Sequence, residues 1–301
     1  MDGHDELARR FEERRGQLRA VAYRMLGSAD EAEDAVQEAW LRLSRTGEDG
    51  IDNLAGWLTT VVSRICLDML RSRSSRREEP YGQEAPERAA VENAPEDEAV
   101  LGDSVGLALL VVLDRLGPAE RVAFVLHDLF GVPFDHIAQV VGRTRPAAKK
   151  LASRARQKVR GTPAVPGAEL DRHRQVVEAF LAAARGGDLD GLLAVLAPDV
   201  VRRADPAALP PGVPPELRGA RAVAEGTVAL RERSRFAATA LVDRSVGVVV
   251  APHGRLLFAL TVTVEDGRIT AYDVVADSAR LDGLDLAVLD LPGISPLSRT
   301  P

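Results

Sequence analysis

The sequence has one cysteine, no long apolar run and no apolar leader. The single cysteine, Cys66, excludes an internal disulfide, and its place in an apolar helical stretch indicates a small core residue. No run approaches the ~18 apolar residues that cross a bilayer. Residues 1–10 are charged and lack the apolar segment of a signal peptide. We therefore expect a cytoplasmic protein without membrane contact.

The charge of the chain is unevenly distributed. The net charge of −6 over 301 residues would by itself argue against a nucleic-acid partner. Acidic residues, however, dominate positions 78–103, whereas positions 143–160 hold eight basic residues and no acid. The average therefore hides a basic segment that suits nucleic acid. The length allows two or three domains of about 100–150 residues, and the hydrophobic fraction of 46% suffices for a core.

The segment 28–43 predicts an amphipathic helix. Its apolar residues recur at helical spacing, and Ser28 followed by Glu31 matches a capping box. A solvated surface would explain an acidic outer face, but one apolar residue among the charges favours a docking surface for a basic partner. The outer face comprises Glu31, Asp34, Gln37, Glu38 and Leu41.

Two further helices are expected around this one, over 5–26 and from about 54 to 73. The second of them carries an arginine-rich outer face. Basic residues at the C-terminal end of a helix interact favourably with the helix dipole, but five arginines are more than this interaction explains. Arginine also binds phosphate oxygens through two parallel hydrogen bonds. The five are Arg64, Arg71, Arg73, Arg76 and Arg77. They predict contact with a nucleic-acid backbone.

The segment 105–160 predicts a helix-turn-helix. A helix over 105–116 is followed by one that begins at Pro118 and another that begins at Phe134, and Gly142 marks the tight turn before the last. Thr144 can cap this last helix. Its outer face is basic throughout, which is typical of a recognition helix in a major groove. His127 and His136 have no neighbours that would complete a metal site.

The C-terminal third predicts an α+β domain. After the Pro/Gly linker 162–167, helices precede strands rich in Val, Leu and Thr. Asp266-Gly267 predicts a hairpin turn in an antiparallel meander, and Pro198 with Asp199 is expected to end a helix. The expected helices are 172–185, 189–196 and 220–233, and the expected strands are 237–242, 246–251, 256–265 and 269–276.

No catalytic constellation stands out in this third. An acid–base enzyme would need a carboxylate and an oxyanion donor that face one cavity. Tyr272 and Asp273 are adjacent on one strand, so they face opposite sides of the sheet. His253, Asp199 and Asp243 offer no better pair. We expect no catalysis, no metal and no cofactor.

The motifs at Asp30–Trp40 and Trp57–Arg71 together resemble region 2 of an extracytoplasmic-function (ECF) RNA polymerase sigma factor. The helix-turn-helix that follows is similar to sigma region 4, and its residues 140–159 resemble the SigJ-like branch. The resemblance implies core RNA polymerase, through the coiled coil of its β′ subunit, and promoter DNA as partners.

The resemblance also assigns roles to residues. The implied polymerase-binding residues are Asp34, Gln37, Glu38 and Leu41, and the implied −10 contacts are the five arginines named above. The implied −35 contacts are Arg143, Arg145, Lys149, Lys150, Ser153, Arg154 and Arg156.

The opening of the C-terminal third, residues 176–201, resembles the SnoaL-like (cystatin-like, NTF2-like) fold, a curved sheet around a helix. SigJ-like factors carry such a domain as a regulator in cis. Two of its usual motifs differ here. Asp205-Pro206-Ala207-Ala208 stands in place of an Asp-Gly-Gly-Gly loop, and 276–281 in place of Asn-Pro-Asp-Lys-Leu. The Trp-Leu-Pro-Glu-Pro motif of the linker is absent.

These observations predict a multidomain chain with two all-α sigma domains and an α+β domain. The expected function is that of an alternative sigma factor with a cis-regulatory C-terminal domain, for which a small ligand is a candidate partner. The alternative is a stand-alone helix-turn-helix DNA-binding regulator with a ligand-sensing SnoaL-like domain, which leaves region 2 without a role. The expected boundaries are region 2 at 1–79, an acidic linker at 80–104, region 4 at 105–161, a linker at 162–170, the SnoaL-like domain at 171–290 and a tail at 291–301.

Overall fold

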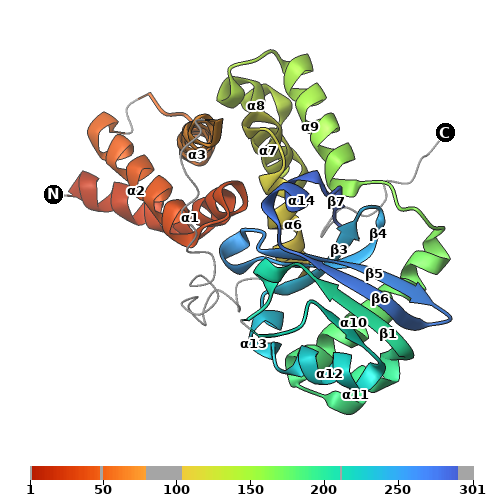
Figure 1. Ribbon diagram of the computed structural model, residues 1–301. Helices are drawn as coiled ribbons and strands as arrows, with labels where there is room; N and C mark the ends of the chain where they lie inside the picture. The colour runs from red at the N-terminus through yellow and green to blue at the C-terminus, as the bar shows by residue number, and fades with distance from the viewer. Residues whose placement is uncertain (1, 48–49, 79–103, 211, 291–301) are drawn as a thin grey trace. The chain divides into compact units, whose positions relative to one another are not determined.

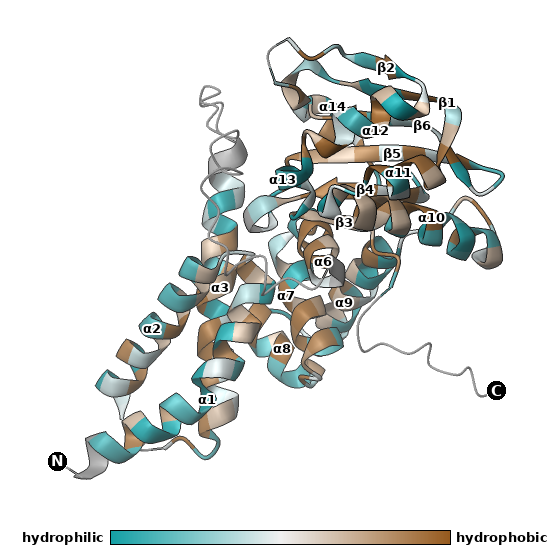
Figure 2. Ribbon diagram, turned by 90° about the horizontal axis from the view of Figure 1, so that it is seen from below, coloured by the Kyte–Doolittle hydropathy of each residue, from teal (hydrophilic) through white to brown (hydrophobic). Residues whose placement is uncertain are grey.

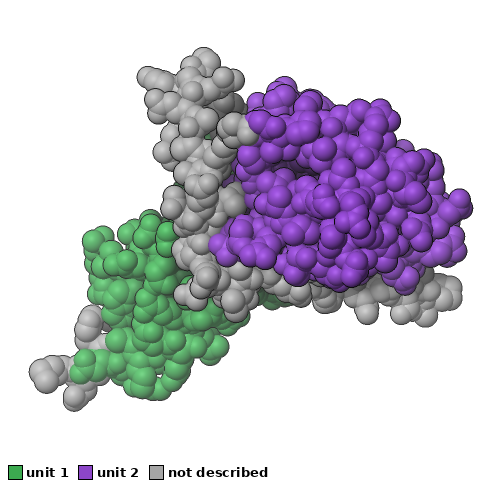
Figure 3. All heavy atoms as spheres, turned by 60° about the horizontal axis from the view of Figure 1, so that its bottom comes forward, with its two compact units in different colours: residues 1–84, 113–158, 296–301 green, residues 85–112, 159–295 purple. Residues whose placement is uncertain are grey.

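The computed structural model describes residues 2–47, 50–78, 104–210 and 212–290 (Figure 1). The expected acidic linker and the C-terminal tail lie almost wholly outside these ranges. The described chain forms two compact units (Figure 3). Of the described residues, the helical unit holds 2–47, 50–78 and 113–158, and the C-terminal unit holds 104–112, 159–210 and 212–290. Among the described helices, none is long and apolar enough to cross a bilayer.

Three long helices open the helical unit, as the sequence predicts. The first two are separated by Gly27, whose φ of +77° suits glycine, and the Ser28 hydroxyl accepts the Glu31 N–H at 3.4 Å to cap the second. The apolar stripe of the second helix is buried, and Phe11 packs on Trp40 with ring centroids 5.1 Å apart. The helices are α1 (Asp2–Leu26), α2 (Ala29–Thr46) and α3 (Leu54–Glu78).

The expected helix-turn-helix is present. Gly142 adopts the left-handed conformation at the tight turn, and the Thr144 hydroxyl accepts the Ala147 N–H at 3.4 Å. The helix that begins at Pro118 is divided, because its second half is a π-helical segment. The elements are α6 (Ser104–Asp114), α7 (Pro118–Phe124), η1 (Val125–Leu129), α8 (Phe134–Val141) and α9 (Arg145–Arg160). The boundary between the two units falls inside α6, after Val112.

The C-terminal unit is a seven-stranded sheet in the order β2-β1-β6-β5-β4-β3-β7. Helices α10 to α12 cover one of its faces (Figure 1). The strands are β1 (Leu196–Ala204), β2 (Glu216–Arg218), β3 (Ala237–Val242), β4 (Ser245–Val250), β5 (Phe258–Glu265), β6 (Arg268–Val275) and β7 (Leu286–Ala287). The helices are α10 (Gly167–Gly186), α11 (Leu189–Val195), α12 (Ala220–Val228), α13 (Arg231–Ser234) and α14 (Ser278–Gly283), with the 3-10 turns η2 (Pro206–Ala208) and η3 (Pro252–Gly254).

The core of this unit lies between the sheet and α10. Val177 and Leu181 pack on strands β3 to β5, and β4 and β5 are largely apolar (Figure 2). Phe180 packs on Tyr272 with ring centroids 5.6 Å apart. The four predicted strands and the Asp266-Gly267 turn are confirmed, since both turn residues have positive φ, as a type I′ hairpin requires.

The strand β1 was not expected. Pro198 and Asp199 were expected to end a helix, but they lie within a strand that pairs in parallel with β6, so the sheet is not a pure meander. The pairing register shifts between Leu196 and Val201. Proline lacks the N–H that a regular ladder requires, so it occurs at such irregularities. Pro198 and Asp199 also interrupt the alternation of apolar and polar residues that would have predicted a strand.

The two altered motifs of the C-terminal unit meet in the structure. The Asp205 carboxylate accepts the N–H groups of Ala276 at 2.9 Å and Asp277 at 3.1 Å, and it pairs with the Arg280 guanidinium. Burial raises the pKa of Asp205, but these three donors outweigh it and hold that pKa below its usual value. The altered sequences therefore form a structural clasp, which we call the Asp205 clasp.

The clasp predicts a pH-dependent contribution to stability. Because the pKa of Asp205 is lower in the folded than in the unfolded chain, the clasp contributes fully above the unfolded value of about 3.9. The contribution is lost as pH falls through the folded value. Asp205→Ala should lower the free energy of unfolding by ~1–3 kcal/mol at pH 7, measured by urea unfolding, and should speed hydrogen exchange at 276–277.

The matched control is Asp199→Asn, an exposed aspartate on β1. It should leave both readouts unchanged. Equal stability of Asp205→Ala and wild type at pH 7 would contradict the clasp.

Candidate nucleic-acid interface

The predicted docking face of α2 lies on the surface of the helical unit. Asp34 and Gln37 are exposed, and no described residue bonds either side chain. Glu38 accepts the Arg42 Nε–H at 2.9 Å. Leu41 is 40% exposed and is the one large apolar side chain exposed among the described residues. The four residues share one face, opposite the apolar stripe that packs in the bundle.

The described arginines of α3 differ in what holds them. Arg64 is exposed, and its Nη2 donates to the Gln139 carbonyl of α8 at 3.1 Å. Arg71 is exposed and lies 3.6 Å from Asp68. Arg73 instead pairs with Glu31 and donates to the Leu26 carbonyl at 3.0 Å, so it ties α3 to the junction of α1 and α2. The side chains of Arg76 and Arg77 lie outside the described residues.

The basic face of α9 is exposed along its first three turns. The opposite stripe, which includes Ala148, Ala152 and Val159, is buried. Arg145 lies 3.4 Å from Asp135, and Lys149 and Lys150 have no partner among the described residues. The exposed predicted contacts are Arg143, Arg145, Lys149, Lys150, Ser153 and Arg154.

Arg156 differs from its neighbours on α9. Its Nε donates to the Asp128 carboxylate of η1 at 2.6 Å, and that carboxylate is only 4% exposed. Glu120 of α7 binds Lys158 at 2.8 Å and lies 3.4 Å from Arg154. The acids that hold α9 in place were not singled out from the sequence, because they lie on α7 and η1 and their partners are 28 to 38 residues away.

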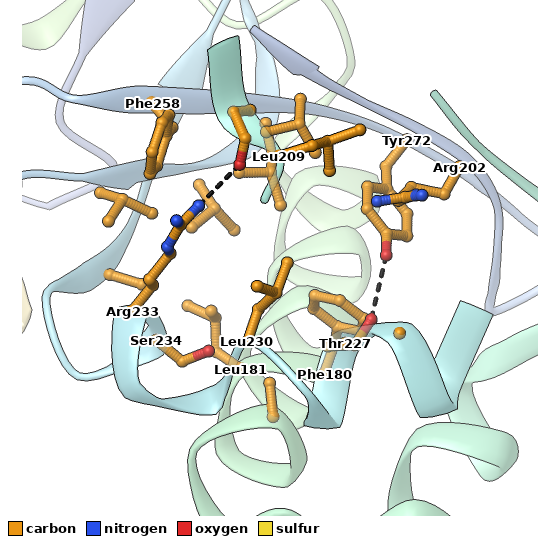
Figure 4. Close-up of a pocket in the computed structure, with 18 residues that line it drawn as sticks. Phe180, Leu181, Arg202, Leu209, Thr227, Leu230, Arg233, Ser234, Phe258 and Tyr272 are labelled. Carbon is orange, nitrogen blue, oxygen red and sulfur yellow. Dashed lines mark hydrogen bonds between the residues drawn. The ribbon is translucent and has the colours of Figure 1, made fainter. Parts of the chain in front are cut away.

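The C-terminal unit holds a cavity of about 100 Å³ between the sheet and its helices (Figure 4). Its walls are mostly apolar, and the Tyr272 hydroxyl lies 3.0 Å from the Thr227 hydroxyl. Burial raises the pKa of Tyr272, so the phenol stays protonated. Arg202 and Arg233 also line the cavity, and none of its lining residues is a carboxylate or a histidine.

The C-terminal residues that could supply acid–base catalysis do not share one cavity. Tyr272 faces the cavity and Asp273, 44% exposed, faces away, as their adjacency predicts. Asp199 and Asp243 are exposed and do not line the cavity. The sequence analysis missed Arg202 because it missed β1, the strand that carries it.

Comparison with known proteins identifies the two helical modules. The Sigma-70 region 2 family matches residues 10–76, and the Sigma-70, region 4 family matches residues 106–159. These matches and the sheet of the C-terminal unit confirm the expected fold class, two helical sigma domains followed by an α+β domain.

Named relatives extend over nearly the whole chain. The probable ECF RNA polymerase sigma factor SigI of Mycobacterium tuberculosis is 40% identical over 94% of this chain and 98% of its own length. The ECF RNA polymerase sigma factor SigJ of the same species is 38% identical over 92% of this chain and 93% of its own. The crystal structure of M. tuberculosis SigJ covers 91% of this chain and 98% of that chain at 36% identity, with a TM-score of 0.45. From the extent and identity of the two sequence relatives, the chain belongs to the ECF RNA polymerase sigma factors, which regulate transcription.

Proposed function

We propose that this alternative sigma factor docks on the β′ coiled coil of core RNA polymerase through the outer face of α2. The carrying observation is Leu41, an apolar side chain exposed among acidic neighbours. Acidic groups steer a basic partner toward the face, and a central apolar anchor supplies affinity once water is excluded. The docking face consists of Asp34, Gln37, Glu38 and Leu41.

The basic face of α9 is proposed to bind the −35 promoter element. Lys149 and Lys150 lie in the first two turns of the second helix of a helix-turn-helix, the part that enters a major groove. Arg143, Arg145, Ser153 and Arg154 flank them on the exposed face. Arg156 has a different role in this proposal: it positions α9 through Asp128.

The −10 element is proposed to contact α3. Arg64 and Arg71 are exposed and can neutralise phosphates, and Arg64 must give up its bond to Gln139 to do so. Arg73 supports the bundle through Glu31. Contacts by Arg76 and Arg77 stay predictions, since their side chains lie outside the described residues.

The C-terminal unit is proposed to adjust sigma activity in cis and to take a small ligand in its cavity. Its cavity has donors and no carboxylate, so it suits binding better than acid–base chemistry. The domain boundaries given from the sequence are part of this proposal. The alternative, a DNA-binding regulator that works without polymerase, is set aside because region 2 of the Sigma-70 family spans residues 10–76.

Leu41→Ala should weaken binding to bacterial core polymerase at least about tenfold, equal to ~1.4 kcal/mol, because the apolar anchor is removed. Biolayer interferometry with immobilised core enzyme measures this. Thr46→Ala, an exposed position on another face of α2, is the control and should bind as wild type. An unchanged affinity for Leu41→Ala would refute the docking face.

The double variant Lys149→Ala/Lys150→Ala should weaken promoter binding by the polymerase holoenzyme without changing thermal stability. Each lost phosphate contact should reduce the slope of log affinity against log salt by about 0.9. Filter binding at several salt concentrations measures both quantities. A wild-type slope and affinity would count against the recognition face.

Arg156→Ala should behave differently, because it leaves the Asp128 carboxylate buried without its partner. We expect a loss of ~1–3 kcal/mol in the free energy of unfolding, since Arg156 is partly screened by solvent. Urea unfolding followed by tryptophan fluorescence reports it, because both tryptophans, Trp40 and Trp57, lie in the helical unit. If Arg156→Ala is as stable as the wild type, the positioning role of Arg156 is refuted.

A further inference from the structure

Arg202 is a buried cation that no described carboxylate neutralises. The residue is 4% exposed, and its Nη2 donates to the Pro214 carbonyl at 2.8 Å. Its Nε is buried and has no hydrogen-bond partner, and no carboxylate of the described residues lies within ion-pair distance of its guanidinium. Burial of a charge is costly unless the charge is paired and hydrogen-bonded. An acceptor from outside the chain would complete this site.

The position of Arg202 aims it at the cavity. Arg202 on β1 is the register partner of Tyr272 on β6, and neighbouring strands in register place such side chains on the same face. Both side chains line the cavity, and Figure 4 shows them together at one end of it. Beside them, the Tyr272 hydroxyl meets the Thr227 hydroxyl at 3.0 Å. This end, which we call the Arg202 end, therefore offers a guanidinium and two hydroxyl groups.

The rest of the cavity is apolar. Phe180, Leu181, Val248 and Leu260 are among the residues that line it. The second cation, Arg233, lies at the other end, where it donates to the Ala208 carbonyl at 2.6 Å and lies over the Phe258 ring, 5.3 Å from its centroid. The volume of about 100 Å³ is below the ~150 Å³ of an apolar cavity that binds benzene. The space therefore suits a compact apolar body with one polar end.

We propose that the cavity binds a small aliphatic monocarboxylate, with its carboxylate at the Arg202 end and its apolar body between α10 and the sheet. Arginine recognises carboxylates by charge-assisted hydrogen bonds. The Thr227 hydroxyl donates to the Val223 carbonyl at 2.8 Å, so the Tyr272 hydroxyl donates to Thr227 and reaches the ligand only by turning away from it. No lining residue is a general base, so the ligand is bound and not converted. The inference rests on the proposed cis-regulatory function, for which it names the ligand class.

The first test uses the wild-type full-length chain and three ligands of one shape. These are propanoate, propan-1-ol and propan-1-amine, which are smaller than benzene, and their binding is measured by isothermal titration calorimetry and saturation-transfer NMR. The carboxylate should bind at least tenfold more tightly than the alcohol, and the amine should not bind. Equal binding of all three, or no binding of the carboxylate, would overturn the proposal.

The second test uses a matched pair of arginines on β1. Arg202→Met should weaken carboxylate binding at least tenfold, whereas Arg203→Met should leave it unchanged, since Arg203 is 52% exposed on the other face. Circular dichroism shows whether each variant is folded. If Arg202→Met does not fold, the comparison of the three ligands on the wild-type chain tests the proposal. Undiminished carboxylate binding by folded Arg202→Met would refute the site.

Both tests use the free chain, so they do not depend on the proposed sigma function. Polymerase affinity with and without saturating propanoate then tests regulation separately. If the ligand binds but polymerase and promoter affinity stay unchanged, the regulatory role is refuted and the binding site is supported. If the chain binds polymerase but no carboxylate, the proposed binding site is refuted and the sigma function is supported.

Discussion

The ion pair between Arg156 and the buried carboxylate of Asp128 fixes how α9 presents its charges. A helix with seven cations could face several ways on electrostatic grounds alone. Asp128 and Glu120 bind the cations near its C-terminal end, and the alanine stripe is buried beneath it. Lys149 and Lys150 are thereby left exposed, and no described residue pairs with them. The availability of charge for DNA thus depends on which cations the acids of α7 and η1 neutralise.

In α2 and α3 as well, some charged side chains pair with another helix and others stay exposed. Glu31 begins the acidic face of α2, but it is bound to Arg73 and so joins the bundle instead of the docking face. The remaining positions keep their charges or amides at the surface around Leu41. The Glu31–Arg73 pair therefore holds helices together, whereas the side chains of the docking face remain at the surface.

Local signals in the sequence predicted most of the fold. The Ser28 cap, the Gly142 turn and the Asp266-Gly267 hairpin each depend on residues a few positions apart, and all are confirmed. Long-range pairings were not predictable. The acids that hold Arg156 and Arg73 come from other helices, and β1 was missed because Pro198 and Asp199 interrupt its alternation. With β1 the sequence analysis also missed Arg202 and the polar end of the cavity.

The central claim is that the chain directs RNA polymerase to a promoter. Run-off transcription tests it most directly, with bacterial core polymerase, the full-length chain and a template taken from upstream of the protein's own gene neighbourhood. The account predicts a discrete transcript that appears only when the chain is added. The absence of a transcript, together with a failure of the chain to co-elute with core polymerase, would contradict it.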